Sequence, residues 1–166
     1  MKRILLIGKR GFLGNYLNKY LSKKFKIKFI SFKKISSIKK SIIKYDYIIN
    51  TSINKNYIKN KYNKKFDNDF QISSFLDPKK NTFIFFSSRK VYKSKGNIKE
   101  NDKLNPLSNY SKNKLITENL LKSKLKSNLL ILRISNIIGF KLKFRKNLHQ
   151  TFVDLFYKKA KKGFIY

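Results

Sequence analysis

Cysteine is absent from this chain of 166 residues, histidine occurs once and acidic side chains number only eight. Without cysteine, the protein can form neither a disulfide nor a thiolate metal site. The single histidine, His149, cannot supply the cluster of ligands that a transition metal needs, so we expect no metal site. These absences exclude the disulfide-stabilised and the transition-metal classes of protein.

Long apolar runs are also missing. The chain opens on a basic start and a short apolar stretch, but Ile4 to Ile7 is too short for the apolar core of a secretory signal. No run elsewhere approaches the roughly 20 residues that span a bilayer. We therefore expect a cytoplasmic protein with no membrane partner. The 41% of apolar residues still suffices for the core of one domain over residues 1–166.

The charge is strongly one-sided, because 41 lysines and arginines against eight acidic residues give a formal net charge of +33. Such an excess is typical of proteins that bind nucleic acid. However, only five of the basic residues are arginine, the side chain that nucleic-acid readers favour for bidentate contacts. The lysines are spread along the chain with isoleucine, asparagine, tyrosine and phenylalanine, which share A/T-rich codons. Genomic base composition is therefore a sufficient explanation, and nucleic-acid binding is kept as an alternative.

Short apolar runs alternate with helical patterns along the chain, as is typical of repeated βα units. The strands expected from these runs are 2–7, 26–32, 47–51, 81–88 and 129–134. Helices are expected at 12–23, at 56–76, from Pro106 onward and at about 148–161. This alternation predicts an α/β fold, a doubly wound parallel sheet covered by helices on both faces.

The first motif of functional interest is Gly8-Lys9-Arg10-Gly11-Phe12-Leu13-Gly14, between the first expected strand and the first expected helix. Glycines there let the backbone turn tightly and approach a phosphate closely. The N-terminus of the helix offers free N–H groups and the positive end of the helix dipole. This context of strand, glycine loop and helix indicates a dinucleotide-binding loop, with a simple glycine turn as the alternative.

Two further segments carry groups suited to acid–base chemistry. Tyr110 and Lys114 are four residues apart, which places them on one face of the expected helix. An ammonium beside a phenol lowers the phenol pKa from about 10, so such a tyrosine can exchange a proton near neutral pH. The spacing also arises by chance in so lysine-rich a chain, as with Tyr20 and Lys24. Ser88 ends a strand at the edge where doubly wound sheets bind ligands, or is simply a polar strand end.

The order of these segments resembles the extended short-chain dehydrogenase/reductases, which are NAD(P)-dependent epimerases, dehydratases and reductases of nucleotide sugars. The resemblance runs over essentially the whole chain and implies a Rossmann-type NAD(P)-binding fold. It rests on five segments in order: GKRGFLG, YDYIIN, FFSSRKVY, NPLSNYSKNKLITE and LLILRISNIIG. The fourth segment is the most specific, because Pro106, Tyr110, Lys114 and Glu118 all match positions of the family.

The resemblance implies a role for each matching residue. Tyr110 matches the catalytic acid/base, and Ser88 matches the group that bonds the reacting oxygen. Lys114 matches the lysine that holds the nicotinamide ribose and lowers the pKa of the tyrosine, and Asn136 matches a position that often reaches the substrate. Family members commonly form dimers, so a homodimer is one assembly that the resemblance implies. The expected cofactor-binding residues are Gly8, Arg10, Gly11, Phe12, Leu13, Gly14, Ser31, Lys33, Asn50 and Lys114.

The cofactor implied by the resemblance is NAD or NADP, and the end of the second strand favours NADP. In NAD enzymes an acidic residue at this point binds the ribose 2′-hydroxyl. Here Ser31 takes that place, lysines follow at 33 and 34, and Arg10 lies in the glycine loop. These cations suit a 2′-phosphate, so we expect a preference for NADP.

These features predict hydride transfer to or from the cofactor at a carbon of a nucleotide-linked sugar. Dehydratases of the family need acidic groups beside the catalytic serine, whereas Arg89 and Lys90 follow Ser88, which favours an epimerase or a reductase. Family members carry a substrate domain beyond the point where this chain ends, so we expect residues 1–166 to be a C-terminally truncated dinucleotide-binding domain. The alternatives are a non-catalytic dinucleotide-binding module and a basic nucleic-acid-binding protein.

Overall fold

The computed structural model describes residues 1–93, 95–137, 160–161 and 163. Within this part of the chain, five parallel strands form one sheet in the order β2-β1-β3-β4-β5. The strand order reverses at β1, which is the switch point beside which doubly wound sheets bind their ligands. The strands are β1 (Arg3–Ile7), β2 (Lys26–Ile30), β3 (Tyr47–Asn50), β4 (Thr82–Ser88) and β5 (Leu129–Ile134).

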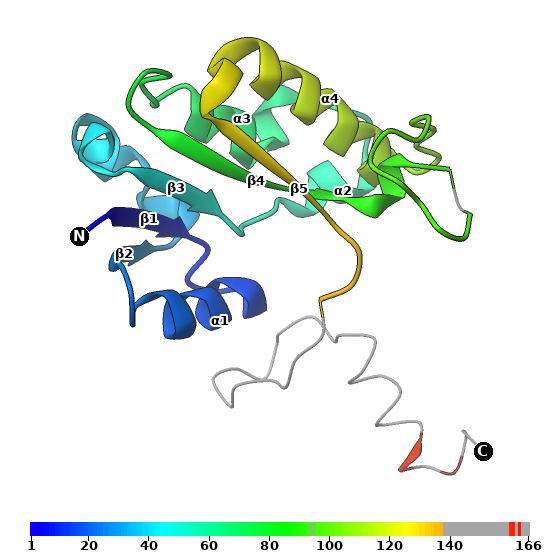
Figure 1. Cartoon of the computed structure of the whole chain (residues 1–166), viewed down its shortest axis with the longest axis horizontal. Helices are drawn as coiled ribbons and strands as arrows, with labels where there is room; N and C mark the ends of the chain where they lie inside the picture. Colours follow the sequence, from blue (N-terminus) through cyan, green and yellow to red (C-terminus); the bar gives the residue numbers. More distant parts are fainter. Residues whose placement is uncertain (94, 138–159, 162, 164–166) are drawn as a thin grey trace.

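Helices cover both faces of this sheet. Helix α1 lies on one face, and α3 and α4 lie on the other (Figure 1). The predicted fold class, an α/β doubly wound parallel sheet of Rossmann type, is therefore confirmed. The α-helices are α1 (Phe12–Leu21), α2 (Lys55–Lys59), α3 (Asn68–Ser73) and α4 (Asn109–Leu125), and the 3₁₀ helices are η1 (Phe32–Lys34), η2 (Ser36–Lys44), η3 (Lys64–Phe66), η4 (Arg89–Val91) and η5 (Lys126–Asn128).

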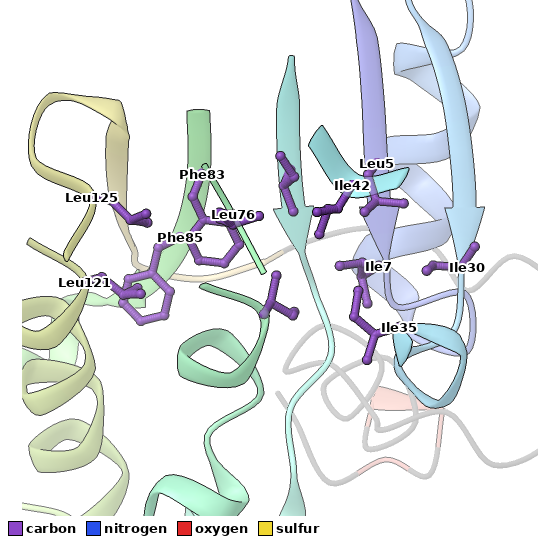
Figure 2. Packing of buried hydrophobic residues seen from close by; sticks show 12 residues of the cluster. Leu5, Ile7, Ile30, Ile35, Ile42, Leu76, Phe83, Phe85, Leu121 and Leu125 are labelled. Atoms are coloured by element: carbon purple, nitrogen blue, oxygen red, sulfur yellow. The ribbon is translucent and has the colours of Figure 1, made fainter. Parts of the chain in front are cut away.

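Alternate residues of β1 contribute to two hydrophobic clusters, one on each face of the sheet. Leu5 and Ile7 belong to the larger cluster, whereas Ile4 and Leu6 face the side of α1. A parallel strand buried on both faces reads as a continuous apolar run, which is why the sequence pattern located it. Figure 2 shows the larger cluster, whose labelled members are Leu5, Ile7, Ile30, Ile35, Ile42, Leu76, Phe83, Phe85, Leu121 and Leu125.

The single helix predicted for 56–76 is wrong, because the structure divides this segment into α2, η3 and α3. Side-chain caps explain the division. The carboxamide of Asn63 accepts a hydrogen bond from the N–H of Lys65, and the carboxylate of Asp67 accepts one from the N–H of Phe70. Each capping residue begins a new short helix, and because its own backbone is extended, the preceding helix cannot continue through it. The lysine-rich periodicity of the segment did not reveal these caps.

The other boundaries lie within a few residues of those expected. Strand β2 ends at Ile30 instead of 32, because η1 begins at once after Ser31. Helix α4 begins at Asn109, with Ser108 as its N-cap and Ser111 completing a reciprocal capping box. The helix predicted at about 148–161 lies almost wholly outside the described residues. In the part of the chain that the structure describes, no helix is both long and apolar enough to span a membrane.

Candidate dinucleotide and catalytic site

Two glycines of the loop between β1 and α1 are required by packing inside the protein. Gly8 has a φ of +123°, a conformation that side chains rarely tolerate, and a Cβ on it would collide with Thr51 Oγ1. A Cβ on Gly14 would lie 2.6 Å from the carbonyl oxygen of Gly8 and 2.7 Å from Thr51 Oγ1. Gly8 and Gly14 therefore allow α1 to pack closely against the ends of β1 and β3.

Gly11, in contrast, is not required by packing. Its φ of −96° is ordinary, and a Cβ would meet its nearest atom, the carbonyl oxygen of Gly8, at 3.4 Å. Gly11 is the N-cap of α1, which has neither a side-chain cap nor an acidic residue in its first turn. The side chain of Asn15 fixes the loop by donating to the carbonyl of Gly11 at 2.7 Å. The uncapped first turn of α1, with Phe12 and Leu13, is the cradle in which we expect a pyrophosphate, and binding there stays a prediction.

A cavity of about 360 Å³ lies beside this loop, at the end of β2. Ser31 lines it, as expected for the residue that takes the place of the ribose-binding acid. Arg10 and Lys33 are exposed and do not line the cavity, whereas Lys9 and Lys34 do. The short helix η1 turns the chain directly after Ser31, which the strand pattern did not reveal. The complete lining is Lys9, Lys28, Phe29, Ile30, Ser31, Lys34, Ser37 and Ile38.

The structure brings Ser88 and Tyr110 together. Ser88 is buried at the end of β4, where its hydroxyl accepts a hydrogen bond from the N–H of Lys90. Tyr110 is half-buried in the first turn of α4, near enough to Ser88 for this side chain to act on its pKa. Burial raises the pKa of Tyr110, the side chain of Ser88 lowers it, and the charge of Asp69 raises it again. The net direction is upward, so the predicted lowering of this pKa by Lys114 is wrong for this structure.

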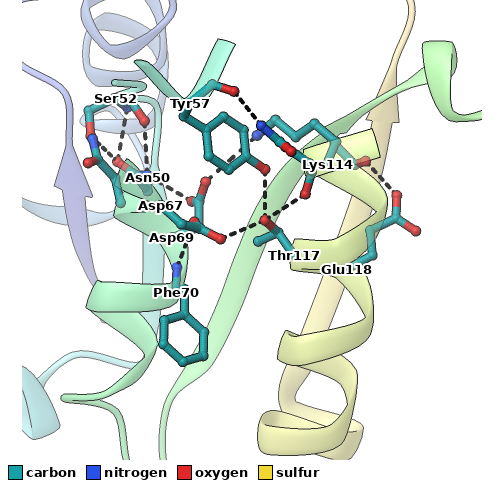
Figure 3. Close-up of polar contacts among 12 residues, drawn as sticks. Asn50, Ser52, Tyr57, Asp67, Asp69, Phe70, Lys114, Thr117 and Glu118 are labelled. Atoms are coloured by element: carbon teal, nitrogen blue, oxygen red, sulfur yellow. Dashed lines mark hydrogen bonds and ion pairs between the residues drawn. The ribbon is translucent and has the colours of Figure 1, made fainter. Parts of the chain in front are cut away.

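Lys114 differs from the expectation because its ammonium group is paired with a carboxylate. Its Nζ atom lies 3.7 Å from Asp69 Oδ2, and the two side chains are 6% and 8% exposed. The same Nζ lies 4.4 Å from the ring centre of Phe85. Burial lowers the pKa of Lys114, and burial also raises the pKa of Asp69 to about 6. Figure 3 shows Asp67 and Asp69 beside the stretch of α4 that carries Lys114.

Asn50, a predicted cofactor-binding residue, uses its side chain inside the protein. Its Nδ2 donates to Asp69 Oδ1 at 2.8 Å and to the carbonyl of Ser52 at 3.1 Å. Its Oδ1 accepts from the backbone N–H and the hydroxyl of Ser52. The side chain therefore orders the turn after β3. Asn136 is exposed just beyond the end of β5, and its predicted contact with substrate stays a prediction.

A second cavity lies next to Ser88, on the side of η4. Its volume is about 300 Å³, and Arg89 and Lys90 are among the residues that line it. Two cations directly after the serine give this cavity a positive potential that favours anionic groups. The other lining residues are Tyr92, Lys93, Ile98, Leu107, Ser108 and Ser111.

Sequence reasoning missed the buried acidic residues of this region. Asp67 and Asp69 are 0% and 6% exposed, and Asp67 accepts hydrogen bonds from Thr117 and Tyr62. The sequence did hold a sign of them: the chain has only eight acidic residues, and two of these are separated by a single residue. An acidic side chain that is not on the surface needs a partner, and here α4 supplies one to each, Thr117 to Asp67 and Lys114 to Asp69.

The parallel sheet, its switch point and the glycine loop define a Rossmann-type α/β protein. The model of the NAD dependent epimerase/dehydratase family matches residues 4–164, and the chain belongs to this family. The resemblance to extended short-chain dehydrogenase/reductases is thereby confirmed. Among curated protein sequences, none matches the chain.

Solved structures of this fold include nucleotide-sugar enzymes. A dTDP-4-dehydrorhamnose reductase from Yersinia enterocolitica is 22% identical at a TM-score of 0.73, covering 98% of this chain and 61% of that one. The corresponding reductase of Bacillus anthracis, in complex with NADP, is 18% identical at 0.71, with coverages of 98% and 61%. A UDP-N-acetylglucosamine 4-epimerase from Methanobrevibacter ruminantium, in complex with UDP-N-acetylmuramic acid, is 19% identical at 0.71, with coverages of 98% and 63%. The chain thus spans about three fifths of each structure.

Proposed function

We propose that this protein catalyses NAD(P)-dependent oxidation or reduction at a carbon of a nucleotide-linked sugar, as a reductase or an epimerase. The observation that carries the proposal is the closeness of Ser88, at the end of β4, to Tyr110 in the first turn of α4, with Lys114 buried one turn further along the same helix. Membership in the NAD dependent epimerase/dehydratase family supports the same chemistry. A non-catalytic dinucleotide-binding module is the second candidate, since the glycine loop and the cavity beside β2 serve cofactor binding without any turnover.

Tyr110 is the acid/base in this proposal. Its raised pKa keeps the proton on the phenol near neutral pH, which suits donation of a proton to the oxygen of a sugar carbonyl. Ser88 bonds the same reacting oxygen and holds Tyr110 in place. A bound nicotinamide dinucleotide supplies hydride transfer, and the residues of this chain orient the sugar and move the proton.

The residues of the cavity beside β2 support NADP as the preferred cofactor. Lys9 and Lys34 are there together with Ser31, and no acidic residue lines it. A 2′-phosphate is attracted by these ammonium groups, whereas the ribose 2′-hydroxyl of NAD lacks its usual carboxylate partner. On the substrate side, Arg89 and Lys90 suit the diphosphate of a nucleotide sugar.

A fluorescence titration of the chain with NADPH and with NADH tests the cofactor site. We expect saturable binding, tighter for NADPH, that is abolished in Gly11→Asp because the new carboxylate fills the cradle at the N-terminus of α1. Gly96→Asp is the matched control, since a side chain at Gly96 meets no atom within 4 Å. Unchanged binding in Gly11→Asp would contradict the assignment, and equal affinity for both cofactors would remove the NADP preference.

The role of Tyr110 is tested by its phenylalanine variant. With dTDP-4-dehydrorhamnose and with UDP-N-acetylglucosamine as substrates, Tyr110→Phe should lose at least about 10²-fold in turnover, the usual contribution of a general acid. Cofactor affinity should stay within a small factor of the wild type. Tyr20→Phe is the control, because Tyr20 is exposed and has a lysine at the same spacing. Cofactor binding without turnover of either sugar by the wild type would favour the non-catalytic module.

A further inference from the structure

Asp69 is a buried carboxylate directly beside the lysine of the catalytic group. Among the described residues, it is the one acidic side chain within ion-pair distance of Lys114. Both oxygens of the carboxylate are engaged, because Oδ2 faces Lys114 and Oδ1 accepts a hydrogen bond from Asn50. The carboxylate is therefore fixed from two sides, by the end of β3 and by α4.

The ammonium of Lys114 is held in a poorly solvated place. The ring centres of Phe85 and Tyr57 lie 4.4 and 5.6 Å from Nζ. A buried ammonium without a carboxylate partner tends to lose its proton or to carry a large energetic cost. Asp69 supplies the missing negative charge, and a lysine ammonium keeps further N–H donors for a ligand.

We propose that Asp69 is a positioning residue that keeps Lys114 charged and aimed at the cofactor ribose. This inference rests on the proposed function and adds a member that the resemblance did not assign. Asp69 acts through Lys114, while Asn50 and Ser52 extend the chain of contacts to the turn behind the glycine loop. A continuous series of polar contacts, from Ser52 through Asn50 and Asp69 to Lys114, thus connects the turn after β3 to helix α4.

Asp67 provides the contrast that separates positioning from simple burial. It is as buried as Asp69 and only two residues away, but its carboxylate bonds Thr117, Tyr62 and the N–H of Phe70. It therefore caps α3 and ties it to α4 without contacting the ammonium of Lys114. Replacing Asp67 should lower the thermal stability, with little effect on a ribose contact made by Lys114.

The pH dependence of cofactor binding follows from the groups that face Asp69. These groups are Lys114 and Tyr110 of α4, Tyr57 of α2 and Asp67 at the start of α3. Tyr57 and Tyr110 have raised pKa values and stay neutral near pH 6, whereas burial lowers the pKa of Lys114 and the charge of ionised Asp69 acts against this lowering. Burial places the pKa of Asp69 at about 6. Cofactor binding should therefore tighten as the pH rises through this value.

The test is an NADPH fluorescence titration of four proteins between about pH 5 and about pH 8. The four are the wild type, Asp69→Asn, Lys114→Met and the double variant. A fifth protein, Asp67→Asn, is titrated in the same way as the control. At neutral pH, Asp69→Asn should weaken binding on the order of tenfold, the loss of one charge-assisted contact. In the Lys114→Met background the same substitution should change affinity by less than about twofold, because its target is gone.

The positioning role of Asp69 and the cofactor site itself can fail independently in this test. An equal effect of Asp69→Asn in both backgrounds, or no effect at all, overturns the positioning role while wild-type binding upholds the cofactor site. A wild type that binds neither NADPH nor NADH overturns both. If Asp69→Asn does not fold, the wild-type pH profile with NADH decides, because the 2′-phosphate of NADPH itself titrates at about pH 6. A step near pH 6 with NADH supports the role, and a flat profile overturns it.

Discussion

At Gly14, an added methyl group would lie 2.6 Å from the carbonyl oxygen of Gly8, whereas at Gly11 the nearest atom is 3.4 Å away. The two glycines of one sequence motif therefore serve different purposes. Gly14 lets a helix approach a strand, whereas Gly11 is free of that demand and is the glycine we propose for close approach of a phosphate. The motif located both residues, but only the packing around Thr51 distinguishes them.

Alanine at each position should separate the two purposes. Gly14→Ala should lower the free energy of unfolding by about 1–3 kcal/mol, because it overpacks the contact between α1 and β1. Gly11→Ala should lower it by no more than about 1 kcal/mol, because its Cβ meets only ordinary contacts and the remaining cost is that of alanine as an N-cap. Urea unfolding followed by circular dichroism measures both values. Equal losses in the two variants would show that Gly11 is also a packing residue.

At the scale of secondary-structure elements, one buried carboxylate connects α4 to the two strands beside it. Glu118 is 0% exposed, and its Oε2 atom lies 2.6 Å from Arg133 Nη2 of β5. Its other oxygen accepts hydrogen bonds from Ser87 of β4 and from Arg133 Nε. Arg133 also donates to the hydroxyl of Tyr92, so the loop after η4 joins the same network. This network fixes α4 against β4 and therefore fixes Tyr110 against Ser88.

Removing Glu118 should destabilise the whole fold. Glu118→Leu leaves the guanidinium of Arg133 without its partner and should cost about 3–5 kcal/mol of unfolding free energy in a urea titration. Lys2→Ala, which breaks the exposed pair with Asp46, is the control and should leave the urea midpoint unchanged. A loss in Glu118→Leu no larger than in the control would mean that solvent replaces the network.

Sequence periodicity was sufficient for elements that bury one continuous face and insufficient for the region between β3 and β4. All five strands and helices α1 and α4 were expected close to their observed bounds, because burial dictates their apolar spacing. The segment 56–76 broke into three pieces because Asn63 and Asp67 cap new turns. Such caps compete with helix continuation, and the outcome depends on contacts such as that of Asp67 with Thr117.

For the whole molecule, the dominant physical property is the formal charge of +33. Ion pairs in the described part of the chain offset a small part of it, among them those of the buried acids Asp69 and Glu118. The remaining lysines repel one another across the surface, and self-repulsion of this kind destabilises a compact state. A field of this sign also favours the approach of anionic ligands in general.

Added salt should therefore stabilise the protein. Between roughly 0.02 and 0.3 M sodium chloride, screening weakens the repulsion, and the midpoint of thermal unfolding should rise by several degrees. Differential scanning fluorimetry at constant pH measures it, and a midpoint that falls with salt would contradict the prediction. Binding to duplex DNA measured in the same series should vanish near roughly 0.15 M if the charge reflects base composition alone.

The sequence by itself determined the doubly wound fold, the glycine loop and the placement of Tyr110 and Lys114 on one helical face. These features depend on spacing within one segment, so they can be read from local order. The tertiary structure decided the partner of Lys114, the upward pKa shift of Tyr110, the internal role of Asn50 and which lysines line the cavity beside β2. Each depends on which distant segments are buried together, because burial and long-range pairing set the cost of a charge and the direction in which a side chain points.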